Sequence, residues 1–242
     1  MKAGAFLAAA RALPLADLAA ITLGQALVLA PHPDDESLGC GGLIAEACAR
    51  GEPPVVVVLT DGAGSHPNSR AYPPARLREA REAETLAAAA CLGLAPGRVV
   101  FMRQPDTRAP SEGWACAEVA SRIAGLVRLH GCRTVLATWA HDPHCDHLAA
   151  HRIAARAAKA TGAVHRAYPV WGLTLPPDAA VSGPATGLRL DVSRRRAAKR
   201  QAIGAHATQH AGVIDDDPAG FQMQPAFMAL FDAGSEIYLD VA

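Results

Sequence analysis

Short apolar runs alternate with longer helical patterns along most of this chain. The apolar runs are continuous and rich in valine and leucine, which is typical of strands buried on both faces of a parallel sheet. They occupy residues 25–31, 53–60, 98–102 and 134–138, with later candidates at 164–173, 188–192 and 237–241. Helical patterns occupy residues 43–50, 76–94, 114–130, 147–159 and 193–209. The alternation predicts βαβ units with right-handed crossovers.

One domain accounts for residues 1–242, because no repeat, linker or break in composition divides the chain. We predict the α/β class: a single Rossmann-like domain whose mostly parallel sheet is flanked by helices on both faces. Residues 1–22 superficially resemble a signal peptide, but Arg11 and Asp17 interrupt their apolar run. We therefore expect a short helix packed on the domain. No apolar run has the length needed to span a bilayer.

Charge and cysteine content narrow the classes of function. The chain has 23 basic and 23 acidic side chains, so it lacks the basic excess of a nucleic-acid-binding protein. We expect a small-molecule or glycan-type substrate, no nucleic acid and no transmembrane segment, and the sequence leaves a homo-oligomer open. None of the 6 cysteines forms a C-x-x-C pair, which favours free thiols in a reducing, cytoplasmic compartment.

Polar loops that contain histidine or aspartate follow the first four predicted strands. Ligands of open α/β sheets bind beyond the carboxyl ends of the strands, so these loops are candidates for a site. The first loop contains His32, Asp34, Asp35 and Glu36. His32 and Asp35 offer a partial ligand set for Zn²⁺ or a similar ion, which leaves Asp34 for proton transfer. The same residues also fit a purely structural role, in which Asp34 or Asp35 caps the N-terminus of a helix and His32 has no function.

The loop after the fourth strand contains a second group, with His144 and His147 three residues apart. Residues at this spacing share a helix face. One of the two can complete a His–Asp–His metal set with an open position for water. The other could act as an acid or an electrostatic stabiliser, held by Asp142 or Asp146. Neither a G-x-G-x-x-G fingerprint nor an H-E-x-x-H pattern is present, which disfavours a dinucleotide-binding protein and a zincin protease.

Two strings in these loops resemble the PIG-L/LmbE family of metal-dependent N-deacetylases. They are PHPDDE at residues 31–36 and H-x-D-H at residues 144–147, where Cys145 replaces the usual proline. The likeness extends to a TDG turn at 60–62, an R-x-x-E-x-x-x-A-x-x-x-L-G helix and a late K-x-x-A-x-x-x-H-x-x-Q helix. It covers roughly residues 26–209.

This resemblance implies an LmbE-like fold and roles for individual residues. The implied metal ligands are His32, Asp35 and His147. Zinc is favoured, while Fe²⁺ or another divalent ion suits the same ligands. Asp34 would be the general base, and His144 would stabilise the oxyanion with Asp146 orienting it. The candidates for substrate binding are Arg81, Asp106, Glu36 and His206.

We therefore predict a zinc-dependent hydrolase that removes an N-acetyl group from an N-acetylglucosamine-type sugar or glycoconjugate. Two alternatives stay open: a zinc amidase acting on a thiol-sugar conjugate or another amide, and a non-catalytic sugar- or metal-binding module. Asp34 argues against the module, since binding alone needs no free carboxylate beside a metal. The loop at residues 63–75, rich in glycine, proline and serine, is either a lid or a direct contact with the substrate.

Overall fold

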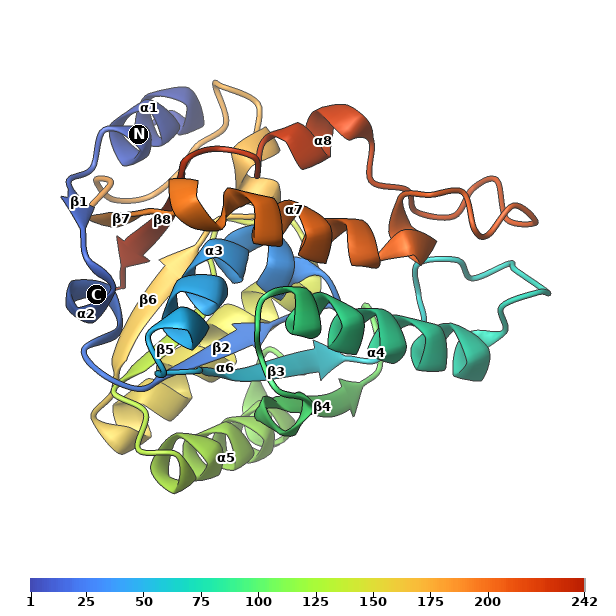
Figure 1. Ribbon diagram of the computed structural model, residues 1–242, viewed down its shortest axis with the longest axis horizontal. Coiled ribbons are helices and arrows are strands. Elements are labelled where there is room, and N and C mark those ends of the chain that lie inside the picture. The colour runs from blue at the N-terminus through green and yellow to red at the C-terminus, as the bar shows by residue number, and fades with distance from the viewer. Residues whose placement is uncertain (242) are drawn as a thin grey trace.

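An eight-stranded sheet runs through the centre of the molecule in the order β1-β7-β8-β6-β5-β2-β3-β4 (Figure 1). The computed structural model describes residues 1–241. The strands are β1 (Leu15–Ala16), β2 (Ala26–Ala30), β3 (Val55–Thr60), β4 (Val99–Gln104), β5 (Thr134–Thr138), β6 (Val164–Tyr168), β7 (Gly187–Asp191) and β8 (Ser235–Asp240). Neighbouring strands pair in parallel except at β8, which is antiparallel to both β6 and β7. The prediction of a mostly parallel sheet is confirmed.

Helices cover both faces of this sheet, as the alternating pattern predicted. The helices are α1 (Ala3–Arg11), α2 (Leu18–Thr22), α3 (Asp35–Ala49), α4 (Pro74–Cys91), α5 (Gly113–Leu129), α6 (Cys145–Thr161), α7 (Arg196–Ala205) and α8 (Pro225–Ala229). Short 3-10 turns are η1 (Pro96–Arg98), η2 (Trp171–Thr174), η3 (Ser193–Arg195) and η4 (Ala207–Gln209). Helices α3, α4 and α7 lie on one face, and α5 and α6 on the other (Figure 1). None of the described helices combines the length and apolar character needed to cross a membrane.

The central strands are apolar at every position because both of their faces are covered. Val28 and Val56 point into the core beneath α3, while Leu27 and Val57 point into the core beneath α5 and α6. Full burial of such a side chain contributes about 1.5–3 kcal/mol. The sequences of these strands are therefore continuous apolar runs, without the alternation of apolar and polar residues that is typical of half-exposed strands.

The chain changes direction along the sheet between β2 and β5. It leaves β2 for its neighbours β3 and β4, then returns to form β5 on the opposite side of β2. The loops after β2 and β5 consequently leave the same edge of the sheet side by side. Such a switch point opens a crevice at the carboxyl ends of the strands. It brings the loop at His32 next to the loop at His144.

Several predicted boundaries differ from the structure. Helix α3 begins at Asp35, eight residues before the predicted start at residue 43, and so includes a run of glycines. A Cβ atom added at Gly39 would lie 2.1 Å from Cδ2 of Tyr168, so glycine permits the close contact between this helix and β6. The predicted strand at 164–173 ends at Tyr168, and the predicted helix at 193–209 divides into η3, α7 and η4.

The first 22 residues form two helices, α1 and α2, with the short strand β1 between them. The sequence predicted a helix here but not β1, which pairs with β7. Phe6 of α1 stacks on Trp139 with ring centroids 4.6 Å apart. This contact confirms that the segment packs on the domain.

We predict that Gly39→Ala lowers the free energy of unfolding by about 1–3 kcal/mol, because overpacking forces Tyr168 or α3 to move. Gly125→Ala in α5 is the matched control, since no heavy atom lies within 4 Å of a Cβ placed there. The control should raise stability by about 0.5–1 kcal/mol through helix propensity. Urea denaturation measures both, and equal effects of the two substitutions would contradict the close contact.

Candidate active site and metal centre

A tight turn between β2 and α3 positions the first group of polar residues. The backbone N–H of His32 donates to Oδ2 of Asp35 at 3.0 Å, which closes the turn. Asp34 adopts φ 146° and ψ −29°, a backbone conformation that residues other than glycine rarely take. Backbone strain of this kind persists where surrounding contacts hold it, and it occurs mostly at functional sites.

Three side chains converge at the end of this turn. Oδ2 of Asp35 lies 3.2 Å from Nδ1 of His32 and 3.2 Å from Nε2 of His147. Ligands placed tetrahedrally around zinc at the usual bond lengths are about 3.3 Å apart. Nε2 of His147 is buried and has no hydrogen-bond partner, which leaves a lone pair free for a metal. The nitrogen and oxygen atoms present therefore fit a divalent ion.

Carboxylates hold the opposite nitrogen of both histidines. Nδ1 of His147 lies 2.9 Å from Oδ2 of Asp142, and Nε2 of His32 lies 3.1 Å from Oδ2 of Asp146. Histidines that bind metals usually donate their other N–H to such a carboxylate, which fixes the ring and makes it a stronger ligand. Asp142 is itself fixed, because Oδ1 accepts from the backbone N–H of Gly172 at 2.7 Å.

Asp146 holds His144 through its backbone and not through its carboxylate. Its carboxylate does not orient His144 but accepts from the backbone N–H groups of Thr107 at 2.7 Å and Ala109 at 3.0 Å, in addition to contacting His32. His144 is held by the backbone instead, since its Nδ1 accepts from the N–H of Asp146 at 3.2 Å. A neutral His144 then carries its proton on Nε2 and keeps one free donor.

His144 stands at the N-terminus of α6 and faces the cavity described below. Burial lowers the pKa of His144, and the neighbouring rings of His32 and His147 lower it further. Both effects favour the neutral ring with its Nε2–H donor. We therefore expect His144 to act as a neutral hydrogen-bond donor.

Arg81 reaches from α4 to the Asp34 turn. Its Nη2 donates to Oδ2 of Asp34 at 3.0 Å and to the carbonyl oxygen of Pro33 at 2.8 Å, and its Nη1 donates to that of Gly62 at 2.9 Å. Burial raises the pKa of Asp34 to about 6, although the charge of Arg81 opposes the shift. Arg81 also lines the cavity, so a contact with the substrate remains a prediction.

Glu36 and His206 are buried behind the turn and do not line the cavity. Oε2 of Glu36 accepts from the backbone N–H of Asp34 at 3.0 Å. Nε2 of His206 lies 3.2 Å from Oε1 of Glu36 and 3.0 Å from Oγ of Ser37. The geometry corrects our expectation of substrate contacts for both residues, since each supports the Asp34 turn from inside the protein.

A cavity of about 160 Å³ opens at these residues. The titratable residues of its lining are His32, Asp34, Asp35, Arg81, Asp106 and His144. Asp106 contacts the centre directly, with Oδ1 3.3 Å from Nε2 of His32, and its Oδ2 accepts from the N–H of Gly64 at 2.8 Å. Gly64 and Ser65 also line the cavity, so the loop predicted as a lid or a contact forms part of its wall.

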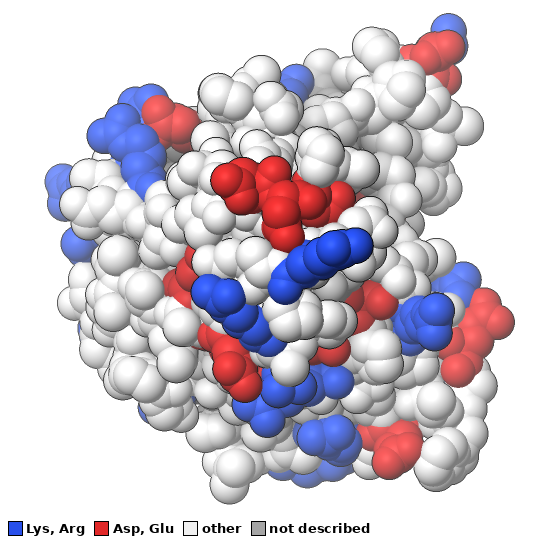
Figure 2. Space-filling model, turned by 90° about the vertical axis from the view of Figure 1, so that its right-hand side faces the viewer, with Lys and Arg blue, Asp and Glu red and all other residues white. Residues whose placement is uncertain are grey.

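The centre holds more negative than positive groups. Asp34, Asp35, Asp142 and Asp146 are all buried, with Arg81 as a guanidinium partner. Although burial opposes it, Asp35 and Asp142 raise the pKa of His147 to about 9. A bound cation would balance the same carboxylates without protons on the histidines. Acidic and basic side chains both occur on the face shown in Figure 2, and the whole chain has 23 of each, so the negative excess is a local feature.

Sequence patterns did not identify the rest of the cavity lining. Trp171 comes from η2, Phe221 and Met223 from the segment before α8, and Phe227 from α8 itself. Gln209 also lines the cavity, and its buried Oε1 has no hydrogen-bond partner. The late K-x-x-A-x-x-x-H-x-x-Q string contained Gln209, but no periodicity marked the aromatic residues.

Comparisons with known proteins identify relatives of this chain. The sequence profile of the PIG-L family, described as GlcNAc-PI de-N-acetylase, matches residues 27–158. A 2'-N-acetylparomamine deacetylase from Streptomyces fradiae is 31% identical over 139 residues, which cover 53% of this chain and 50% of the relative. The chain therefore matches about half the length of that curated relative.

Two solved structures resemble the fold over nearly the whole chain. A conserved protein from Thermus thermophilus superimposes with a TM-score of 0.63 and 25% identity, covering 90% of this chain and 94% of that one. A pseudoaglycone deacetylase gives a TM-score of 0.67 with 21% identity, covering 90% of this chain and 97% of that one. Both support a single α/β domain.

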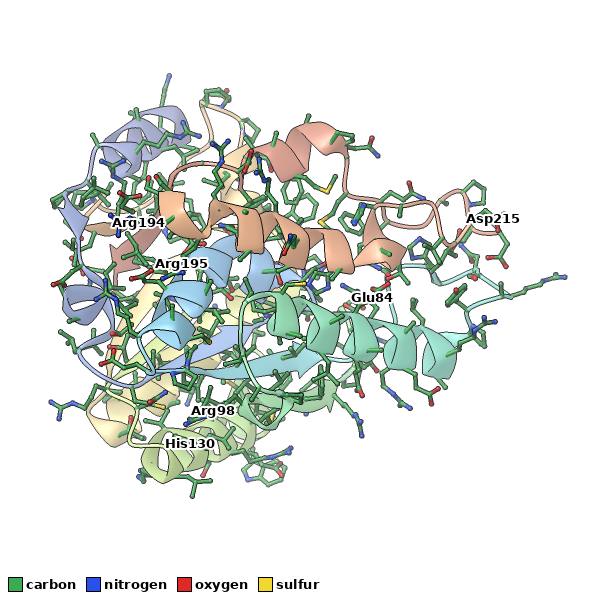
Figure 3. All side chains as sticks on the ribbon, in the orientation of Figure 1. Glu84, Arg98, His130, Arg194, Arg195 and Asp215 are labelled. Atoms are coloured by element: carbon green, nitrogen blue, oxygen red, sulfur yellow. The ribbon has the colours of Figure 1, made fainter. Side chains whose placement is uncertain are left out.

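We predict that Asp142→Asn weakens divalent metal binding about 10–100-fold, because the carboxylate that holds Nδ1 of His147 is lost. Asp215→Asn is the matched control, since Asp215 lies exposed at the outer tip of the segment before α8 (Figure 3). Competition with a chromophoric chelator measures the affinity, and circular dichroism checks the fold. A folded Asp142→Asn variant with the original affinity would refute the assigned contact.

Proposed function

This chain belongs to the PIG-L family, and from that premise we propose that it is a metal-dependent N-deacetylase of an N-acetylglucosamine-type sugar or glycoconjugate. The observation that carries the proposal is the convergence of His32, Asp35 and His147 beside a buried Asp34 at the cavity. The description of the family and the name of the Streptomyces fradiae relative both support removal of an acetyl group from an amino sugar.

We assign the metal to His32, Asp35 and His147, because Oδ2 of Asp35 lies 3.2 Å from one ring nitrogen of each histidine. Zinc suits this set of two imidazoles and one carboxylate, and Fe²⁺ suits it as well. When bound, such an ion lowers the pKa of water and polarises an acyl oxygen. Asp142 and Asp146 keep the two imidazoles in the orientation that binding needs.

Asp34 is the proposed general base. It lines the cavity, and its pKa of about 6 is close to neutral pH, where a group that must both accept and release a proton is most effective. Asp34 removes a proton from the attacking water and later delivers it to the departing nitrogen. The C–N bond breaks, and the products are acetate and a free amine. Arg81 keeps the carboxylate at a fixed angle during both transfers.

His144 is the proposed donor to the acyl oxygen. As water adds to the carbonyl carbon, negative charge develops on that oxygen, and the Nε2–H of His144 can donate to it. The backbone N–H of Asp146 holds the ring in place for this contact. Asp106 lines the same cavity and can accept hydrogen bonds from sugar hydroxyls.

The direct test combines metal analysis with acetate release. The metal-loaded protein should release one acetate for each amine formed from at least one member of a panel of N-acetyl amino sugars. Removal of the metal with a chelator should abolish release, and addition of zinc should restore it. A metal-loaded protein that releases no acetate from any member of the panel would refute the proposal.

We expect Asp34→Asn to lower kcat about 10²–10⁴-fold, because the amide cannot accept the proton from water. Its metal content should stay at the original level, whereas His147→Ala should lose the metal. Acetate release and elemental analysis separate the two effects. Normal turnover of Asp34→Asn would show that another group is the base.

For His144→Ala, we expect kcat to fall about 10²–10³-fold with little change in KM, because the donor acts on charge that develops during the reaction. His141→Ala is the matched control, since His141 contacts Oγ of Ser182 away from the cavity. Steady-state kinetics measures both variants. Similar losses in the two would argue against the role of His144.

A further inference from the structure

The cavity at the metal centre is polar on one side and apolar on the other. Its apolar residues, here called the apolar wall, are Leu38, Trp171, Phe221, Met223 and Phe227. Together they present three aromatic rings and two flexible apolar side chains. The proposed reaction at the acetamide uses none of these groups.

The aromatic rings of the apolar wall support one another. Trp171 stacks on Phe227 with ring centroids 4.3 Å apart, and Phe221 meets Trp171 edge-on at 5.5 Å. Met223 and Phe227 are only 3% and 9% exposed, so their positions are fixed by packing. The wall is a built surface and not a set of free side chains.

Backbone hydrogen bonds fix the segment that carries Phe221 and Met223. The N–H of Phe221 donates to the carbonyl oxygen of Ser65 at 2.7 Å, and that of Met223 donates to the carbonyl oxygen of Gln209 at 2.7 Å. Ser65 belongs to the loop after β3, so two segments far apart in sequence form one rim of the cavity. Figure 1 shows these segments side by side beyond the ends of α4 and α7.

Two aspartates strengthen this rim. Asp216 accepts from Oγ of Ser69 at 2.6 Å and from the backbone N–H of Arg70 at 2.7 Å. Asp217 accepts from the backbone N–H of Asn68 at 2.9 Å. The apolar wall is therefore formed before any ligand binds, and a preformed surface spends little binding energy on ordering.

The wall and the catalytic residues come from different parts of the chain. The titratable lining residues, from His32 to His144, lie within residues 27–158, which match the family profile. Trp171, Phe221, Met223 and Phe227 all lie beyond residue 158. Leu38 alone of the wall lies in the family region, so most of this surface comes from a part of the chain that the profile does not match, and it is placed where it can select among substrates.

We propose that the apolar wall is a subsite for an apolar substituent of the substrate, which is therefore an amphiphilic N-acyl amino sugar. The proposal rests on the N-deacetylase function proposed above. Sugar hydroxyls need hydrogen-bond partners, and among the five side chains of the apolar wall the indole N–H of Trp171 is the one strong polar group. Methylene or aryl groups, in contrast, gain from contact with the rings.

Two parts of such a substrate could occupy the wall: an acyl chain longer than acetyl, or an apolar group on the anomeric oxygen. The cavity of about 160 Å³ is smaller than the roughly 300–1,000 Å³ of pockets that enclose whole ligands, so it takes up one part of a larger molecule. Both sources share the same chemistry at the wall, and two substrate series distinguish them.

The first experiment measures kcat/KM for both series. One extends the N-acyl chain of methyl glucosaminide from acetyl to hexanoyl, and the other keeps N-acetyl and changes the glycoside from methyl to hexyl and phenyl. Each methylene buried on the wall should raise kcat/KM about fourfold in the series whose substituent reaches it. Flat profiles in both series, with the shortest substrate hydrolysed, would refute the subsite and leave the proposed function intact.

The second experiment removes one ring of the wall. Phe221→Ala should lower the ratio of kcat/KM between the longest and shortest substrates at least tenfold in the responsive series. Val213→Ala is the matched control, because it truncates an apolar side chain of the same segment that is 43% exposed and lies off the cavity. That control should leave the ratio unchanged. If this ratio stays unchanged in both Phe221→Ala and Trp171→Ala, the apolar wall does not bind the substituent and the proposal is refuted.

A binding measurement keeps the test independent of turnover and of metal loading. Isothermal titration calorimetry with hexyl and methyl glucosaminide, and with N-hexanoyl and N-acetyl methyl glucosaminide, compares affinities in the chelator-treated protein. In at least one of these two pairs, the compound with the six-carbon group should bind tenfold or more tightly than the compound with the short group. Phe221→Ala should remove this difference in affinity. Equal affinities in both pairs would refute the subsite even if no amide were hydrolysed.

Discussion

Buried negative charge is the constraint on which the rest of this structure depends. Four aspartates lie at the carboxyl ends of β2 and β5 with little access to water, and an isolated buried carboxylate is strongly unfavourable. Each is balanced differently. Arg81 pairs with Asp34, backbone N–H groups and an imidazole surround Asp142 and Asp146, and two imidazoles approach Asp35. The last arrangement supplies a ready set of ligands for a cation.

The fold makes this concentration of charge possible. The sheet changes direction between β2 and β5, so the two loops that carry the ligands leave it side by side. Helices α3 and α6 begin within these loops, and Asp35 and Asp146 lie in their first turns, where the helix dipole favours a negative charge. The strained backbone of Asp34 is tolerated because Arg81 binds the carbonyl oxygen, and Glu36 the N–H, of the peptide group between Pro33 and Asp34.

The features that could be predicted from the sequence are those that depend on local patterns of residues. Valine and leucine runs identified the strands because burial on both faces leaves no alternation, and short spacings brought the candidate ligands together. Contacts between distant segments could not be read in this way. The carboxylate of Asp146 binds the N–H of Thr107 and the ring of His32, while His144 is held by the backbone N–H of the same residue, and no spacing along the chain signals this arrangement. Glu36 and His206 failed as substrate contacts for the same reason, since their burial depends on tertiary packing.

The two halves of the cavity have different structural requirements. Proton transfer and metal binding need atoms placed within fractions of an ångström, so these residues stand on the ends of strands and helices, which are the most rigid positions of the fold. An apolar contact depends on shape and area and tolerates looser placement. Irregular segments can therefore form it, provided that they are held together. Asp216 and Asp217 do this by binding backbone N–H groups of the facing loop, so that chain without regular structure still presents a fixed surface beside the metal centre.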